Sequence, residues 1–149
     1  TKKQAEQYIK DYFETYPKVK EYMDSLVEMG KSKGYVTSLY GRRRPIPELS
    51  AKNFMQRQFG ERIAMNSPIQ GTAADIIKIA MNRVDARLRK ENMQSRLILQ
   101  IHDELLVETK IEEIEEVSHI LNEEMIHAAA LKVPLIADVK QGTTWYEAK

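Results

Sequence analysis

The residues best suited to chemistry in this sequence are three consecutive polar side chains, His102, Asp103 and Glu104, between two short apolar runs. The runs, residues 96–101 and 105–108, are rich in Leu, Ile and Val, so the triplet is predicted to be the turn of a β-hairpin. Such a turn would project adjacent carboxylates from a sheet edge, and carboxylate oxygens are preferred ligands of Mg²⁺. The alternative, which the pattern alone favours, is a turn that uses Asp103 only for its backbone conformation.

A second set of candidates is spaced four residues apart along the chain: Arg62, Asn66 and Gln70. If one helix continued through them, all three would lie on one face, where they could contact phosphates and base edges. A solvated helix face would explain the same spacing, and Pro68 predicts a kink or a short break. A third feature, the run Arg42-Arg43-Arg44, is more typical of an exposed loop than of a site.

The elements that must position these side chains are predicted to be mainly helical. Thr1 and Gln4 have capping-box spacing, Tyr16-Pro17 separates two amphipathic helices, and Gly34 suits a left-handed cap that ends the second. Further helices are predicted over about 51–66, 70–91 and 111–130, with Ser67-Pro68 between the first two. Strands are predicted over 35–40, 96–101, 105–108 and 135–139, with residues 41–45 as a turn or loop. The fold class is therefore α+β, with helices packed on one face of a small antiparallel sheet.

Composition excludes several classes of protein. The 149 residues include no Cys, which rules out disulfide frameworks, thiolate zinc sites and cysteine nucleophiles. No apolar run approaches the length of a membrane span, and no glycine-rich phosphate loop occurs. The net charge is only +1, but residues 31–62 hold eight basic and two acidic side chains. That stretch suits either contact with a polyanion or a solvated face.

Four blocks of sequence, in order, resemble the bacterial family A DNA polymerases. They are Gly34–Arg44 (GYVTSLYGRRR), Phe59–Asp75 (FGERIAMNSPIQGTAAD), Leu99–Leu105 (LQIHDEL, similar to motif C of that family) and Thr143–Lys149 (TTWYEAK). The resemblance covers essentially the whole chain. It implies the end of the fingers over about residues 1–50, and the C-terminal palm with the motif C hairpin over about residues 51–149.

The resemblance also implies roles for single residues. Asp103 would be one of two aspartates that hold the catalytic Mg²⁺ ions, and Glu104 an acidic neighbour that also serves the metal site. His102 would lie near the primer strand. The residues that would contact primer–template DNA are Arg62, Asn66 and Gln70, on the minor-groove side of the duplex, and Arg44, on its backbone.

Two parts of the family pattern are missing from the sequence. It contains neither the motif A stretch with the first aspartate nor the nucleotide-binding helix, and Phe59-Gly60 does not supply the latter. The lack of an initiator Met favours truncation. Because two-metal phosphoryl transfer needs ligands for both cations, the chain is expected to be inactive alone, although its parent would synthesise DNA.

The resemblance implies primer–template DNA and deoxynucleoside triphosphates as partners, and no membrane. The parent protein is expected to be a monomeric bacterial protein of the cytoplasm, associated with the nucleoid. One alternative is a free-standing, non-catalytic module that binds duplex DNA through residues 31–62 and carries His102–Glu104 as a relic turn. A helical interaction domain that binds no nucleic acid is a third possibility.

Overall fold

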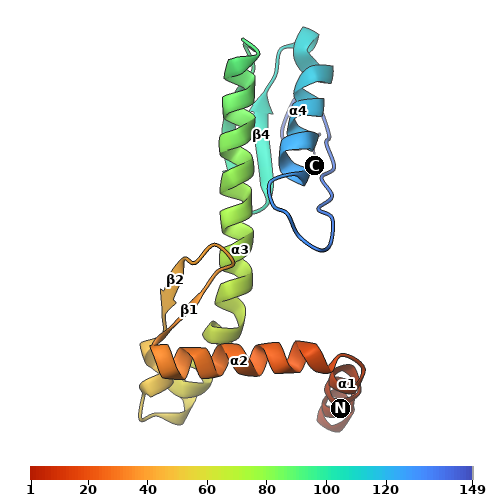
Figure 1. The fold of residues 1–149 in the computed structure, drawn as a ribbon. Helices are drawn as coiled ribbons and strands as arrows, with labels where there is room; N and C mark the ends of the chain where they lie inside the picture. The colour runs from red at the N-terminus through yellow and green to blue at the C-terminus, as the bar shows by residue number, and fades with distance from the viewer. Residues whose placement is uncertain (149) are drawn as a thin grey trace. The chain divides into compact units, whose positions relative to one another are not determined.

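A computed structural model describes residues 1–148 of the chain, which divide into two compact units (Figure 1). The N-terminal unit spans Thr1–Thr72, and the C-terminal unit runs from Ala73 onward. One long helix contributes its first half to one unit and its second half to the other. Within residues 1–148, no helix combines the length and apolar character that crossing a bilayer needs.

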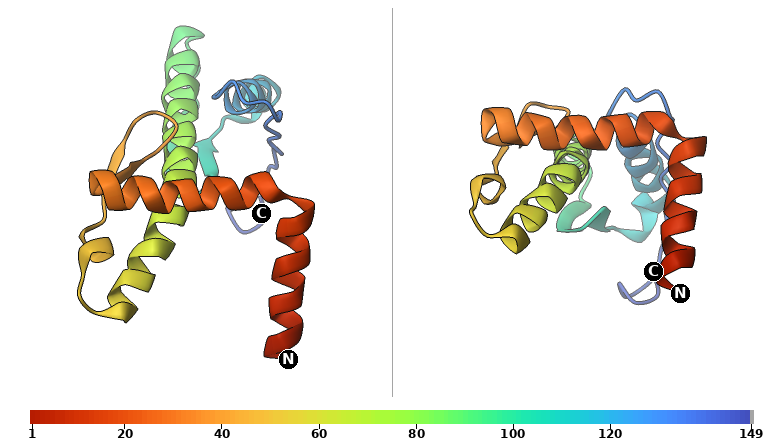
Figure 2. Two further views of the ribbon diagram at one scale, coloured as in Figure 1. Left: turned by 60° about the horizontal axis from the view of Figure 1, so that its bottom comes forward. Right: turned by 90° about the horizontal axis from the view of Figure 1, so that it is seen from below.

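The N-terminal unit opens with two helices joined at an elbow (Figure 2). Helix α1 is Lys2–Thr15, and the predicted capping box between Thr1 and Gln4 is present at its start. Helix α2 is Pro17–Lys33, with Pro17 in its first turn. Gly34 ends it in the left-handed conformation (φ 76°), which confirms the prediction.

A small antiparallel hairpin follows these helices. Strand β1 (Tyr35–Thr37) pairs with β2 (Arg43–Pro45), so the expectation of only a turn or loop over residues 41–45 is wrong for its last three residues. Val36 lies opposite Arg44 and is fully buried. Its burial explains the pairing, because packing decides whether a short strand forms. The 3₁₀ turn η1 (Pro47–Ser50) comes next.

The longest element is helix α3, Phe54–Lys90, which runs through Pro68 without interruption. The predicted break at Ser67-Pro68 is therefore wrong. A proline inside a helix removes one backbone hydrogen bond and costs about 3 kcal/mol or more. Here Pro68 is itself buried, and Ala64 belongs to a core cluster that also contains Val36, Ile46 and Leu49. This burial offsets the cost of the proline.

The C-terminal unit contains a second antiparallel hairpin. Strand β3 (Arg96–Ile101) pairs with β4 (Glu104–Glu108), as predicted, with a register shift between Leu97 and Leu99. The 3₁₀ turn η2 (Ile111–Glu113) leads into helix α4 (Ile114–Ile126), which is shorter than the predicted range of 111–130. Residues of α3 and α4 form the core beneath β4: Val84, Leu88, Val117 and Ile120.

The segment Leu135–Val139 was predicted to be a strand but has no strand pairing within the described part of the chain. The Asn122 side chain donates a hydrogen bond to the Ala137 carbonyl of this segment (2.7 Å). A β-strand exists only where a second strand satisfies its backbone groups. The α+β class is confirmed, but the β structure in residues 1–148 consists of two separate two-stranded sheets and not one.

Candidate active site and nucleic-acid interface

The polar triplet lies at the tight turn that joins β3 to β4. Ile101 pairs with Glu104, so His102 and Asp103 form the turn and Glu104 begins β4. His102 adopts a left-handed backbone conformation (φ 51°), which is uncommon for residues other than Gly but less so for His, Asn and Asp than for other side chains. The Gln100 side chain donates a hydrogen bond to the His102 carbonyl (2.7 Å). All three side chains of the triplet are exposed, so the turn presents them to solvent.

The apolar side of β4 holds this turn in place. Leu105 and Val107 pack against the core formed by α3 and α4, in which Val84 and Ile120 are fully buried. Because Leu105 directly follows Glu104, the packing begins one residue from the acidic turn. A rigid support of this kind suits carboxylates that must keep a fixed position.

The carboxylates have the right chemistry for a hard divalent cation but are too few to complete a site. Asp103 and Glu104 offer oxygen donors, as Mg²⁺ prefers. Residues 1–148 contain no group of three or more His, Asp or Glu side chains arranged to hold a metal ion. The turn can therefore supply only part of a ligand set.

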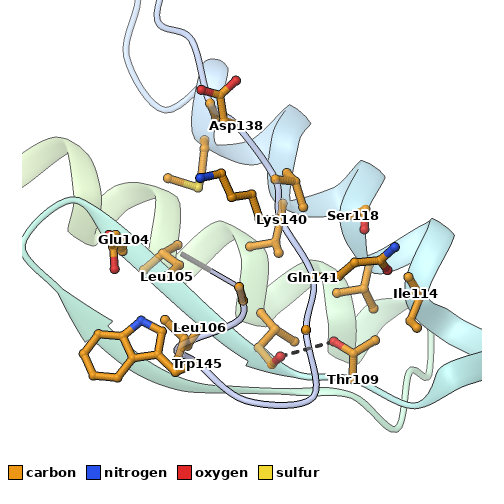
Figure 3. A pocket seen from close by; sticks show the side chains of 18 of the residues that line it. Glu104, Leu105, Leu106, Thr109, Ile114, Ser118, Asp138, Lys140, Gln141 and Trp145 are labelled. Atoms are coloured by element: carbon orange, nitrogen blue, oxygen red, sulfur yellow. Dashed lines mark hydrogen bonds between the residues drawn. The ribbon is translucent and has the colours of Figure 1, made fainter.

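A cavity of about 530 Å³ begins at the same turn. It lies within the C-terminal unit and is lined by β4, by α4 and by the segment 136–142. Figure 3 shows Glu104 at one end of the cavity and Thr109 with Ile114 towards the other. Sequence reasoning missed this feature, because the segment that forms one of its walls was predicted to be a strand.

Two groups of hydrogen bonds to carboxylates link elements of the C-terminal unit. One joins the residues between α3 and β3 to Glu113, just before α4, and the other joins α3 to α4. Backbone N–H groups of Gln94 (3.0 Å) and Ser95 (2.9 Å), with the Ser95 hydroxyl, donate to Glu113 and hold its pKa below the usual value. Arg87 of α3 donates to Glu91 and to Glu123 of α4, and these bonds raise the pKa of Arg87 above its usual value. These charged residues connect elements within the C-terminal unit, and none of them is a predicted site residue.

The row Arg62, Asn66 and Gln70 lies on the first half of α3, and all three side chains are exposed. Because the helix is continuous through Pro68, the four-residue spacing places them along one face. The Arg62 guanidinium lies over the Phe59 ring, 5.8 Å from its centroid, which limits where that cation can point. The structure thus joins the three residues into one surface row.

The three arginines of residues 42–44 have different surroundings in the N-terminal unit. Arg42 donates to the Gly71 carbonyl of α3 (2.8 Å), and Arg43 lies 4.8 Å from the centroid of the Tyr35 ring. Arg44 is exposed on β2 opposite Val36. Only Arg44 was a candidate contact. Its strand, β2, pairs with β1, whose Val36 is buried with Ala64 of α3.

The predicted site residues therefore form two groups, one in each unit. The N-terminal unit brings Arg44 and the α3 row onto elements that share one core. The C-terminal unit holds His102, Asp103 and Glu104 on one turn.

The chain is similar in sequence to known proteins of one family. The family model of DNA polymerase family A matches residues 1–147. The chain is 52% identical to DNA polymerase I of Geobacillus stearothermophilus and 51% identical to DNA polymerase I of Bacillus subtilis, each over 149 residues. Each match covers 100% of this chain but only 17% of the relative, so the chain spans about a sixth of the length of these curated relatives.

A solved structure is also similar. It is the POL domain of Pol1 from M. smegmatis in complex with DNA primer-template and dNTP. The TM-score is 0.95 at 39% sequence identity, and the match covers 99% of this chain and 26% of that chain.

Proposed function

This chain belongs to DNA polymerase family A, and on that basis we propose that the protein containing it is a DNA-directed DNA polymerase. In the reaction the primer 3′-hydroxyl attacks the α-phosphate of an incoming deoxynucleoside triphosphate, and pyrophosphate leaves. The solved relative bound to primer-template and dNTP supports these substrates. We call the polypeptide that contains this chain the full-length polymerase.

The acidic turn of β3–β4 is the part of this chain that we assign to catalysis. Asp103 would bind Mg²⁺ directly, with Glu104 as a second acidic group at the site and His102 near the primer strand. When bound, two Mg²⁺ ions stabilise the attacking and leaving oxygens. The second aspartate and further ligands would come from motif A, which this sequence does not contain. The exposed, rigidly supported turn favours this role over a purely conformational one.

The N-terminal unit would bind the primer–template duplex. Asn66 and Gln70 carry donors and acceptors that suit base edges, and the minor groove presents acceptors common to all base pairs. Contacts there check pair geometry with little regard to sequence, which suits a polymerase. Arg62 and Arg44 would add charge-assisted contacts to the duplex, Arg44 on a phosphate.

We assign residues 1–50 to the end of the fingers and residues 51–149 to the C-terminal palm. The chain alone would lack polymerase activity, because the nucleotide-binding helix and the motif A aspartate are outside its sequence. The full-length polymerase would act as a monomer in the bacterial cytoplasm at the nucleoid.

The observation that carries the proposal is the placement of Asp103 at a tight, well-supported turn, where it helps to line a cavity. The experiment is primer extension by the full-length polymerase with Mg²⁺ and all four nucleotides, repeated after chelation of the metal. We expect metal-dependent extension that Asp103→Ala abolishes. Full activity of Asp103→Ala would contradict the assignment.

One observation favours a second candidate function, a free-standing module that binds duplex DNA without catalysis. Asp103 and Glu104 lack a third His, Asp or Glu ligand within residues 1–148, whereas the N-terminal unit holds all of its proposed DNA contacts. The native mass distinguishes the two candidates. A product much larger than 17.3 kDa supports the polymerase, and a product of that mass supports the module.

A further inference from the structure

A threonine hydroxyl on α3 joins the helix to the β1–β2 hairpin. The Leu39 backbone N–H donates to Thr72 Oγ1 (2.9 Å), and that hydroxyl donates to the Pro68 carbonyl one helical turn earlier (2.7 Å). Thr72 Oγ1 is therefore acceptor for the hairpin and donor to the helix. Both bonds lie in the N-terminal unit.

The surface of α3 beside Thr72 is shaped to receive the same hairpin. The Arg42 guanidinium donates to the Gly71 carbonyl (2.8 Å). A Cβ atom added at Gly71 would lie 3.4 Å from both Ser38 Cβ and Arg42 Nη2, which is tighter than most such contacts. The hairpin thus meets α3 at the two residues that directly follow Gln70.

The hairpin and the helix also meet through apolar side chains. Val36 packs with Ala64, and burial of this kind is not directional. Hydrogen bonds weaken steeply when their angles change, so the bond from Leu39 to Thr72, together with the bond from Arg42 to Gly71, fixes where the hairpin sits along α3.

We propose that Thr72 is a positioning residue for duplex binding. Its hydroxyl sets the spacing between Arg44 on the hairpin and Asn66 with Gln70 on α3, so that all three reach the same duplex. The inference rests on the proposed binding of primer–template by these residues. It assigns Thr72 no contact with DNA or with the reacting atoms.

The test is a double-mutant cycle in the full-length polymerase, with primer–template affinity measured by fluorescence anisotropy at several salt concentrations. Thr72→Val removes the hydroxyl and keeps the shape of the side chain. It should fold, because the Leu39 N–H lies where water can replace the lost bond. Thr72→Ser keeps the hydroxyl. Thr15→Val is the matched control, since Thr15 makes the same bond to a carbonyl one turn earlier (Asp11, 2.9 Å), but on α1.

We expect Thr72→Val to weaken primer–template affinity by about tenfold, while Thr72→Ser and Thr15→Val stay within about twofold. The slope of log affinity against log salt should fall by about 0.9 in Thr72→Val, as expected for one lost phosphate contact. Arg44→Ala should then reduce primer–template affinity much less in the Thr72→Val background than in the wild type.

Two results would overturn the proposal while leaving the proposed function intact. One is an equal loss of primer–template affinity on Arg44→Ala in the wild type and in the Thr72→Val background. The other is a Thr72→Val variant with a lower melting temperature but unchanged salt slope, which would make the hydroxyl merely structural. If the wild-type polymerase fails to bind primer–template at all, the proposed function itself is wrong.

Discussion

The two hairpins of this chain differ in how α3 holds them and in what they present. The β1–β2 hairpin packs on α3 through Val36 and is also tied to it by polar bonds, from Leu39 to Thr72 and from Arg42 to Gly71, and it presents the cation of Arg44. The β3–β4 hairpin rests on α3 and α4 through apolar side chains and presents carboxylates at its turn. The same supersecondary element, a β-hairpin, thus presents a basic surface in one unit and an acidic one in the other.

The difference bears on the tasks proposed for the two units. Binding a duplex adds several weak, separate contacts, and the N-terminal unit carries four such candidates. Metal-dependent chemistry needs a complete ligand set at one point, and the turn of β3–β4 supplies only Asp103 and Glu104. The comparison therefore predicts that binding and turnover respond to different substitutions.

The largest expected effect comes from removing the proposed metal ligand. Asp103→Ala should lower the turnover of the full-length polymerase by about a thousandfold or more, because metal-ion stabilisation of the transition state contributes several kcal/mol. Primer–template affinity should stay within a few-fold. Glu108→Gln, at the far end of β4 and exposed, is the control and should retain turnover. Substantial turnover by Asp103→Ala would end the distinction between the two hairpins.

The next largest effect concerns the support of the β3–β4 hairpin. Ile120→Ala removes a fully buried side chain beneath β4 and should lower the free energy of unfolding by about 2–5 kcal/mol. Denaturant titration of the 149-residue chain followed by Trp145 fluorescence measures this. Ile98→Ala, at a position that is 58% exposed on β3, should cost less than about 1 kcal/mol. Equal losses for the two variants would mean that the core does not support the hairpin.

A smaller effect separates two kinds of DNA contact within the N-terminal unit. Arg44→Ala should weaken binding by about tenfold and lower the salt slope by about 0.9, because it removes the proposed phosphate contact. Gln70→Ala should weaken binding by a few-fold and leave the salt slope unchanged, since the amide is uncharged. Anisotropy titrations of the full-length polymerase measure both. Arg89→Ala, exposed on the second half of α3, is the control, and a loss of affinity there would contradict the assignment.

The smallest effect is a pH dependence confined to the C-terminal unit. Hydrogen bonds from the Gln94 N–H and from Ser95 hold the pKa of Glu113 below the ordinary value of 4.5. A lowered folded-state pKa gives stability that is present above the unfolded pKa and is lost as pH falls through the folded value. The melting temperature of the wild type should exceed that of Glu113→Gln at neutral pH, and the gap should narrow below about pH 4.5. Glu112→Gln is the control for loss of one charge, and a constant gap at all pH values would refute the prediction.

Local patterns in the sequence predicted the ends of α1 and α2 and the second hairpin well. The capping box at Thr1, the Gly34 cap and the turn at His102 depend on neighbouring residues, which the sequence contains in full. The candidate site residues were likewise chosen from residue type and local spacing alone.

The errors arose where distant residues decide the structure. Burial of Val36 with Ala64 makes β2 a strand and helps to keep α3 intact through Pro68, and neither contact is visible in local spacing. Leu135–Val139 has strand composition but no partner strand among the described residues. The role of Thr72 was equally hidden, because its bond to Leu39 joins residues 33 positions apart.

One paired measurement tests the central claim, that this chain binds primer–template but cannot catalyse alone. The purified 149-residue chain is titrated with labelled primer–template, and the same samples then receive Mg²⁺ and all four nucleotides. The account predicts binding that weakens steeply with salt and no extension of the primer. Processive extension by the pure chain, or the absence of salt-dependent binding, would contradict it.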